Sequence, residues 1–269
     1  MKNIAVGFQN PERTNDPKFL IDFLDKYDQI DSVRVCKQQM LKFLDIRKGH
    51  RVLDIGCGAG QEVQRIQQLV GAHGLVVGVD KSEVMIEEAK RRADELNLPV
   101  KYYIGDANSL NMNNNSFDIC RAERVLLYLE NPKNAVSEMI RVLAPGGKLA
   151  IFDFYLDGTF VNSTYPALTR KIIGYITDSF PNALIGCKLP EIFEELKLSN
   201  VAVTPHPHTI IKDYEAFMWV FHGILEQALK EKVLSESDLY KWVKQLEEMH
   251  KKGQFFAGSL GFIVTGTKS

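Results

Sequence analysis

The sequence lacks the features that mark several specialised classes of protein. Its 33 lysines and arginines and 34 aspartates and glutamates leave a net charge of −1, so no overall field favours nucleic acid or an anionic membrane as a partner. No apolar stretch approaches the roughly 18 residues that a membrane-spanning helix needs. The four cysteines lie far apart without a CxxC pair, which argues against a disulfide framework or a zinc site. We therefore expect a cytoplasmic protein with reduced thiols that binds neither a membrane nor nucleic acid.

What the sequence does contain is an alternation of strand-like and helix-like segments. With 269 residues, 45% of them hydrophobic, the chain is long enough to bury a full core. Short apolar runs, typical of strands buried on both faces, recur with helical patterns between them at residues 51–55, 75–80, 100–104, 117–121 and 148–153. This alternation predicts right-handed βαβ units and a doubly wound, Rossmann-like α/β fold. Two more strands, at 200–204 and 258–267, complete a mostly parallel seven-stranded sheet.

The most informative stretch is the segment RVLDIGCGAG at residues 51–60. Gly56, Gly58 and Gly60 form a turn in which a positive φ costs little and no Cβ keeps a ligand from the backbone. The following helix directs its N-terminal amides at such a ligand. A phosphate loop, GxxxxGK[ST], is absent, and Gln61 stands where a dinucleotide fingerprint requires glycine. The turn therefore predicts a nucleotide-type site that differs from both.

An acidic residue at the end of the next predicted strand supports that interpretation. Asp80 ends the predicted strand at residues 75–80 and follows the last glycine of the turn by 20 residues. In nucleotide-binding folds of this plan, an acid at the tip of the second strand accepts hydrogen bonds from ribose hydroxyls. We therefore expect Asp80 to bind a ribose.

Five segments together resemble one family: VLDIGCGAG, VVGVDKS, GDA, SFDICRAERVLLYL and RVLAPGGKLAIFD. They are similar to motifs of class I S-adenosylmethionine-dependent methyltransferases, especially small-molecule enzymes of the ubiquinone and menaquinone C-methyltransferase group. The resemblance implies S-adenosylmethionine as cofactor and S-adenosylhomocysteine as product. It implies that Asp54 supports the methionine end of the cofactor and that Asp106 accepts from the adenine amine. The further contacts that it implies are with Gly56, Gly58, Gly60, Asp80, Lys81, Ala107 and the backbone of Arg121 and Ala122.

Helical patterns outside the motifs predict additions to the core. We expect a helical lid over residues 1–44, beginning with a mobile arm at 1–16, and a methyltransferase domain over 45–269. Cap insertions are expected at about 156–186 and 209–255. All of them would lie near the carboxyl ends of the strands, where such sheets bind ligands. Arg34 or Gln38, in the second helix of the lid, would reach the methionine carboxylate or close the lid.

Several side chains near the expected mouth of the site are candidates for proton transfer. They are Glu123, Tyr128, Asp153, Tyr155 and His222, and their spacing does not single out one of them. Glu123 and Arg124 also fit a helix cap and a surface charge, and His222 also fits a packed core histidine. Tyr128 stands where many relatives have histidine. We expect no metal, because His206 and His208 have no cysteine or third histidine nearby.

The sequence thus predicts methyl transfer by in-line displacement to a small, apolar or aromatic metabolite. One alternative is an S-adenosylmethionine-binding sensor or partner subunit without activity. A less favoured alternative is a methyltransferase of RNA or protein, against which count the absent basic surplus and the absent NPPY-type tetrapeptide. The acceptor atom, and whether the protein is a monomer or a homodimer, stay open.

Overall fold

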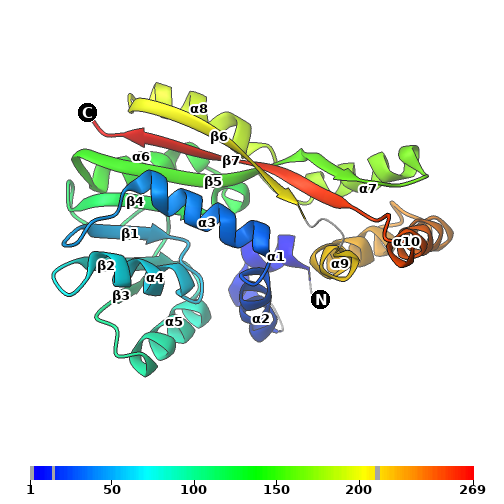
Figure 1. The fold of residues 1–269 in the computed structure, drawn as a ribbon, viewed down its shortest axis with the longest axis horizontal. Coiled ribbons are helices and arrows are strands. Elements are labelled where there is room, and N and C mark those ends of the chain that lie inside the picture. Colours follow the sequence, from blue (N-terminus) through cyan, green and yellow to red (C-terminus); the bar gives the residue numbers. More distant parts are fainter. Residues whose placement is uncertain (1–2, 14–15, 210–212) are drawn as a thin grey trace.

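The fold is a single seven-stranded sheet with helices on both faces (Figure 1). The structure is a computed structural model that describes residues 3–13, 16–209 and 213–269. The strands run in the order β3-β2-β1-β4-β5-β7-β6; β1 to β5 pair in parallel, and β7 pairs antiparallel with both β5 and β6. The predicted fold class is therefore confirmed. The strands are β1 (Arg51–Ile55), β2 (Leu75–Asp80), β3 (Lys101–Ile104), β4 (Phe117–Glu123), β5 (Leu143–Val161), β6 (Ser199–Thr209) and β7 (Ala257–Thr267).

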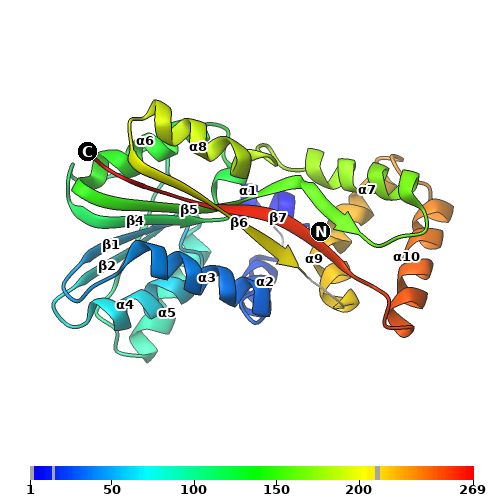
Figure 2. The ribbon, with the colours of Figure 1, turned by 45° about the horizontal axis from the view of Figure 1, so that its top comes forward.

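Five of the described helices cover most of the two faces of the sheet. Figure 2 shows α3 (Asp31–Leu44) on one face, with α6 (Pro132–Val142) and α8 (Ile185–Glu195) on the other. The remaining two, α4 (Gln61–Val70) and α5 (Glu83–Glu95), follow β1 and β2 and pack on β1, β2 and β3. Both begin directly after the carboxyl end of a strand, so the N-terminus of α4 faces the glycine turn. No helix in the described part of the chain is long and apolar enough to cross a membrane.

The N-terminal residues are more ordered than their polarity predicts. The expected mobile arm is wrong over residues 3–13, which contain α1 (Ile4–Gln9) and the short helix η1 (Pro11–Arg13). The Asn3 side chain caps α1 by accepting from the Ala5 amide at 2.9 Å, and Ile4 and Ala5 are buried. The next helix, α2 (Pro17–Tyr27), begins behind an Asp16 cap, and its Phe23 ring stacks on Trp219 at 4.6 Å. These helices thus pack against the C-terminal part of the chain.

The later additions differ in part from prediction. β5 ends at Val161 rather than Asp153, because the long strand β7 offers pairing partners as far as Ala257. Within the region of the second expected insertion lie two helices, α9 (Tyr214–Lys230) and α10 (Glu236–Lys251). They pack with α7 (Pro166–Asp178) beyond the end of the sheet (Figure 1). The division into a lid and a main domain stays a prediction.

Candidate active site

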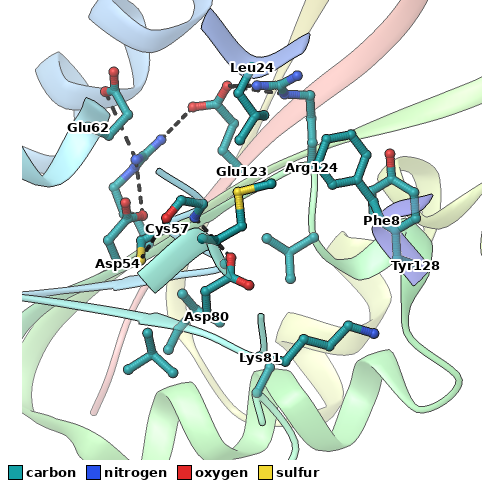
Figure 3. Close-up of a pocket in the computed structure, with 18 of the residues that line it drawn as sticks. Phe8, Leu24, Asp54, Cys57, Glu62, Asp80, Lys81, Glu123, Arg124 and Tyr128 are labelled. Atoms are coloured by element: carbon teal, nitrogen blue, oxygen red, sulfur yellow. Dashed lines mark hydrogen bonds and ion pairs between the residues drawn. The ribbon is translucent and has the colours of Figure 1, made fainter. Parts of the chain in front are cut away.

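A cavity lies at the carboxyl ends of β1, β2 and β4, beneath the N-terminal helices (Figure 3). Three groups of side chains and backbone meet there. The first is the glycine turn with the tips of β2 and β3, the second is a charged wall, and the third is apolar. The lining residues that the following paragraphs use are Phe8, Phe23, Leu24, Lys37, Asp54, Gly56, Gly58, Glu62, Asp80, Lys81, Asp106, Ala107, Arg121, Glu123, Arg124, Val125, Tyr128 and Leu129.

The glycine turn has the backbone that its sequence predicts. Gly56, Gly58 and Gly60 have φ values of +66°, +51° and +84°. A Cβ on Gly56 would lie 2.3 Å from Val125, and one on Gly58 would lie 2.7 Å from Leu24, so side chains would fill the floor of the cavity. Among the described residues Gly60 is not part of the lining, because its Cα faces the hydroxyl of Tyr102 instead.

The tips of β2 and β3 supply carboxylates beside this turn. Asp80 accepts from the Gly58 amide at 2.9 Å and from the Ser82 amide at 3.0 Å. Burial raises the pKa of Asp80, and these amide hydrogen bonds oppose the rise. Each carboxylate oxygen keeps a lone pair for a ligand hydroxyl. Lys81, Asp106 and Ala107 also line the cavity, so the structure brings together most of the residues that the resemblance implied.

A charged wall closes one end of the cavity. The Arg121 side chain, 1% exposed, donates to Asp54 at 3.0 Å and to Glu123 at 2.7 Å. Glu123 also pairs with Arg124 at 3.2 Å. From α3, Lys37 pairs with Glu62 at 3.3 Å. Figure 3 shows Glu62, Asp54 and Glu123 on the same side of the cavity. We expected a backbone contact from Arg121, whereas the structure places its whole side chain in the wall.

The two strand-end acids of the wall, Asp54 and Glu123, have pKa values that are shifted in opposite directions. Burial raises the pKa of Asp54 to about 6, although Arg121 acts in the opposite direction. Burial also acts to raise the pKa of Glu123, but the charges on Lys37, Arg124 and Arg121 outweigh it and hold that pKa below its usual range. Glu123 is therefore an ionised, weakly basic group at neutral pH, which makes it a poor proton acceptor.

The opposite end of the cavity is apolar. Phe8 and Phe23 from the N-terminal helices face Val125, Tyr128 and Leu129 from the segment after β4. The Tyr128 ring lies between Phe8 and Phe180, with both centroid distances 5.7 Å. Burial raises the pKa of Tyr128, so its hydroxyl stays protonated and can donate a hydrogen bond.

Asp153 supports this segment from below. It is fully buried and accepts from the amides of Leu126 at 2.9 Å and Leu127 at 3.2 Å, in the short helix η2 (Leu126–Tyr128). Burial raises its pKa to about 7, against the effect of these hydrogen bonds. Asp153 thus fixes the backbone that carries Tyr128 and does not belong to the lining that the described residues form.

Four other candidates lie outside the lining formed by the described residues: Arg34, Ala122, Tyr155 and His222. The His222 side chain is 63% exposed and lies 3.9 Å from Glu226, so the interpretation as a packed core histidine is wrong. Arg34 donates to the Asp28 carbonyl at 3.2 Å and is not part of the lining that the described residues form. The helix was predicted correctly, but Lys37 is the residue that reaches the site.

Sequence reasoning also missed Phe8, Leu24 and Glu62. One signal was available for Lys37, because it lies on the apolar stripe of α3 with Val33, Met40 and Leu44. A lysine on a buried helical face needs anionic partners, and here it has two. No comparable pattern marks Phe8 or Leu24, whose contacts with the cavity arise only from the packing of α1 and α2.

Comparison with known proteins agrees with this geometry. The chain matches the methyltransferase-domain family over residues 46–254. An uncharacterised protein of a Streptomyces fradiae transposon is 30% identical over 249 residues, which cover 91% of this chain and 70% of that protein. A demethylmenaquinone methyltransferase of Staphylococcus aureus is 33% identical over 134 residues, which cover 48% of this chain and 55% of that enzyme. The chain therefore spans about half the length of this named relative.

Solved structures show the same fold. The YcgJ protein of Bacillus subtilis has a TM-score of 0.61 at 22% identity, covering 86% of this chain and 97% of that one. The [4+2]-cyclase SpnF has a TM-score of 0.56 at 22% identity, covering 88% and 80%. With the glycine turn, the acid at the tip of β2 and the family match over most of its length, the chain belongs to the methyltransferase-domain family and has the fold and motifs of class I S-adenosylmethionine-dependent methyltransferases.

Proposed function

We propose that this protein transfers a methyl group from S-adenosylmethionine to a small apolar or aromatic metabolite held in the cavity. The observation that carries the proposal is that one cavity joins a glycine turn, a charged wall and an apolar end. These three parts suit, in turn, the nucleoside of the cofactor, its amino-acid zwitterion and an apolar methyl acceptor. The S. aureus relative is named for a quinone substrate, which fits an apolar aromatic acceptor.

The residues present fit the cofactor. Gly56 and Gly58 leave the floor open, and Asp80 and Asp106 offer carboxylates for the ribose hydroxyls and the adenine amine. In the wall, Glu62 Oε2 and Arg121 Nε are buried without a hydrogen-bond partner among the described residues. Such atoms are costly unless a ligand or water satisfies them. We assign Lys37 and Arg121 to the carboxylate of the methionine end, and Asp54 and Glu62 to its ammonium group.

When bound, S-adenosylmethionine supplies an electrophilic methyl group on a sulfonium. The protein's own task is then alignment and exclusion of water. Phe8, Leu24 and Val125 exclude water from the cavity, and Asp153 fixes the backbone of η2. The Tyr128 hydroxyl, held protonated by burial, donates a hydrogen bond to the acceptor. Glu123 keeps Arg121 and Arg124 in place rather than accepting a proton.

Calorimetry with S-adenosylhomocysteine tests the cofactor assignment. We expect Asp80→Ala to weaken binding by about tenfold or more, because two ribose hydrogen bonds to a charged group are lost. The matched control is Asp118→Ala, which removes an acid that pairs with Arg51 at the opposite end of the sheet, at 3.1 Å. Equal affinity in wild type and Asp80→Ala would remove the ribose assignment.

Turnover needs a separate test, because a fold shared with a [4+2]-cyclase does not by itself establish methyl transfer. Incubation with S-adenosylmethionine and a panel of quinols and phenols, followed by mass spectrometry, should reveal a product heavier by one methylene unit. Tight cofactor binding without any such product would favour the alternative of a binding protein.

A further inference from the structure

Arg124 lines the cavity where the charged wall meets the apolar side chains, whereas its sequence position fits a surface charge as well as a pocket role. Its side chain is 17% exposed, and its guanidinium lies 4.3 Å from the centre of the Tyr27 ring. Tyr27 stacks on Phe23, which stacks on Trp219, at centroid distances of 5.4 and 4.6 Å. A row of rings from α2 and α9 thus holds the cation in one place.

The backbone at Arg124 is also unusual. Its φ of +56° is a left-handed conformation, which is unfavourable for a residue with a side chain. The conformation persists because the Arg124 amide donates to the Phe152 carbonyl at 2.8 Å, directly after the last residue of β4. The strand end therefore directs this side chain along the wall of the cavity, between Glu123 and Phe8 (Figure 3).

The charge of Arg124 is only partly balanced by protein. Its Nε and Nη2 atoms reach the same oxygen of Glu123, at 3.3 and 3.2 Å. The other Glu123 oxygen is bonded more closely by Arg121, at 2.7 Å. Two guanidinium groups thus share one carboxylate. A guanidinium carries five N–H groups. Two nitrogens of Arg124 reach Glu123 and the guanidinium also hydrogen-bonds the Tyr27 side chain, which leaves donors for a ligand.

The side chains around Arg124 indicate which kind of ligand would balance its charge. Phe8, Val125, Tyr128 and Leu129 line the same end of the cavity and cannot neutralise a cation. A partly balanced cation beside apolar side chains favours an anion, because charges interact strongly where water is excluded. The Tyr128 hydroxyl adds a neutral donor to the same region.

We infer that Arg124 determines specificity by binding an anionic oxygen of the methyl acceptor, which is then an apolar compound carrying an ionised carboxyl, phenol or enol group. The inference rests on the proposed function, because it takes the apolar end to be the acceptor site. It narrows the acceptor class from apolar metabolites in general to apolar acids.

The test compares two probes of nearly the same shape, 2-naphthoate and the neutral 2-naphthamide, on the full chain saturated with S-adenosylhomocysteine. We expect wild type to bind the naphthoate about tenfold more tightly than the amide, as a charge-assisted pair in a shielded site allows. Arg124→Gln should bring the ratio of the two affinities close to one, and Arg124→Lys should retain part of it. Arg51→Gln, which removes an arginine at the opposite end of the sheet, should leave the ratio unchanged.

A third probe distinguishes the source of the anion. 4-Nitrophenol, measured below and above the pH at which it ionises, shows whether a phenolate is preferred as a carboxylate is. If only 2-naphthoate is preferred over its neutral form, Arg124 binds a carboxylate that does not itself react. If the phenolate is preferred as well, Arg124 can also bind the oxygen that attacks the methyl group. A ratio near one in wild type, or a ratio that survives Arg124→Gln, overturns the inference.

Failure of the proposed function gives a different result. If S-adenosylhomocysteine does not bind, the cofactor assignment fails, and the naphthoate ratio is then measured on the protein alone. Normal S-adenosylhomocysteine binding with no discrimination between the two naphthalene probes contradicts only the role of Arg124.

Discussion

The two ends of the cavity are built in different ways. The cofactor end is mostly backbone and strand-end acid, with Gly56 and Gly58 from the turn after β1 and Asp80 from the end of the adjacent strand β2. The acceptor end is mostly side chain, with Phe8 from α1, Phe23 from α2 and Tyr128 from the segment after β4. A backbone site changes only if the fold changes, whereas a side-chain site changes with each substitution. The donor is therefore fixed by the architecture, and the acceptor by residues that the architecture leaves free.

The strongest test of this contrast is a substitution that adds a Cβ to the floor of the cofactor end. We expect Gly56→Ala to weaken S-adenosylhomocysteine binding by about a hundredfold or more, because the methyl group would lie 2.3 Å from Val125 and force the turn to move. Isothermal calorimetry measures the loss, and thermal unfolding measures the accompanying loss of stability.

Gly49→Ala is the matched control for backbone strain. Gly49 has a φ of +86° but nothing within 4 Å of its would-be Cβ. The substitution should cost about 1 kcal/mol of stability through its dihedral angles alone, without weakening the cofactor. If both variants lose affinity equally, strain transmitted through the fold explains the effect and the close approach at Gly56 does not.

The charged wall provides the next largest effect. We expect Lys37→Met to weaken S-adenosylhomocysteine about tenfold or more, because it removes a cation that we assign to the methionine carboxylate. Arg34→Met, three residues earlier on α3 and outside the described lining, should bind the ligand as wild type does. Calorimetry on the two variants decides whether Arg34, the candidate from sequence, or Lys37, which lines the cavity, binds the cofactor.

This pair of residues also shows where prediction from sequence stops. The fold and the glycine turn were predictable because strand periodicity, glycine spacing and strand-end acids are local patterns, and Gly58 and Asp80 lie where those patterns place them. Lys37 and Arg34 lie on one helix, and only the docking of α3 onto the sheet decides which one faces Glu62. Phe8 and Leu24 depend on how α1 and α2 close over the turn, which no local pattern specifies.

Tyr128 provides a smaller effect confined to the acceptor end. We expect Tyr128→Phe to lower kcat about tenfold while leaving S-adenosylhomocysteine affinity unchanged, because only a hydrogen bond to the acceptor is lost. Tyr240→Phe on α10, where the residue is 65% exposed, is the control for loss of a tyrosine hydroxyl. A tenfold loss of cofactor affinity in Tyr128→Phe would contradict the division of the cavity into two ends.

The smallest expected effect concerns the contact that joins the N-terminal helices to the cofactor end. Asp25 on α2 accepts two hydrogen bonds from Arg92 on α5, each 2.7 Å, and a third from Gln61 at 2.8 Å. These bonds hold α2, and with it Leu24, over Gly58. We expect Arg92→Gln to raise the dissociation rate of S-adenosylhomocysteine about threefold to fivefold, as loss of a partly exposed ion pair implies.

Stopped-flow displacement measures that rate, and its dependence on salt is informative. The difference between wild type and Arg92→Gln should shrink at high ionic strength, because the salt bridge to Asp25 is partly exposed and therefore screened. Arg91→Gln is the matched control, since Arg91 pairs with Glu88 and Glu95 within α5. Equal dissociation rates in the two variants would mean that α2 stays closed without Asp25, and that the apolar contacts of Phe23 with Trp219 and Tyr27 hold it instead.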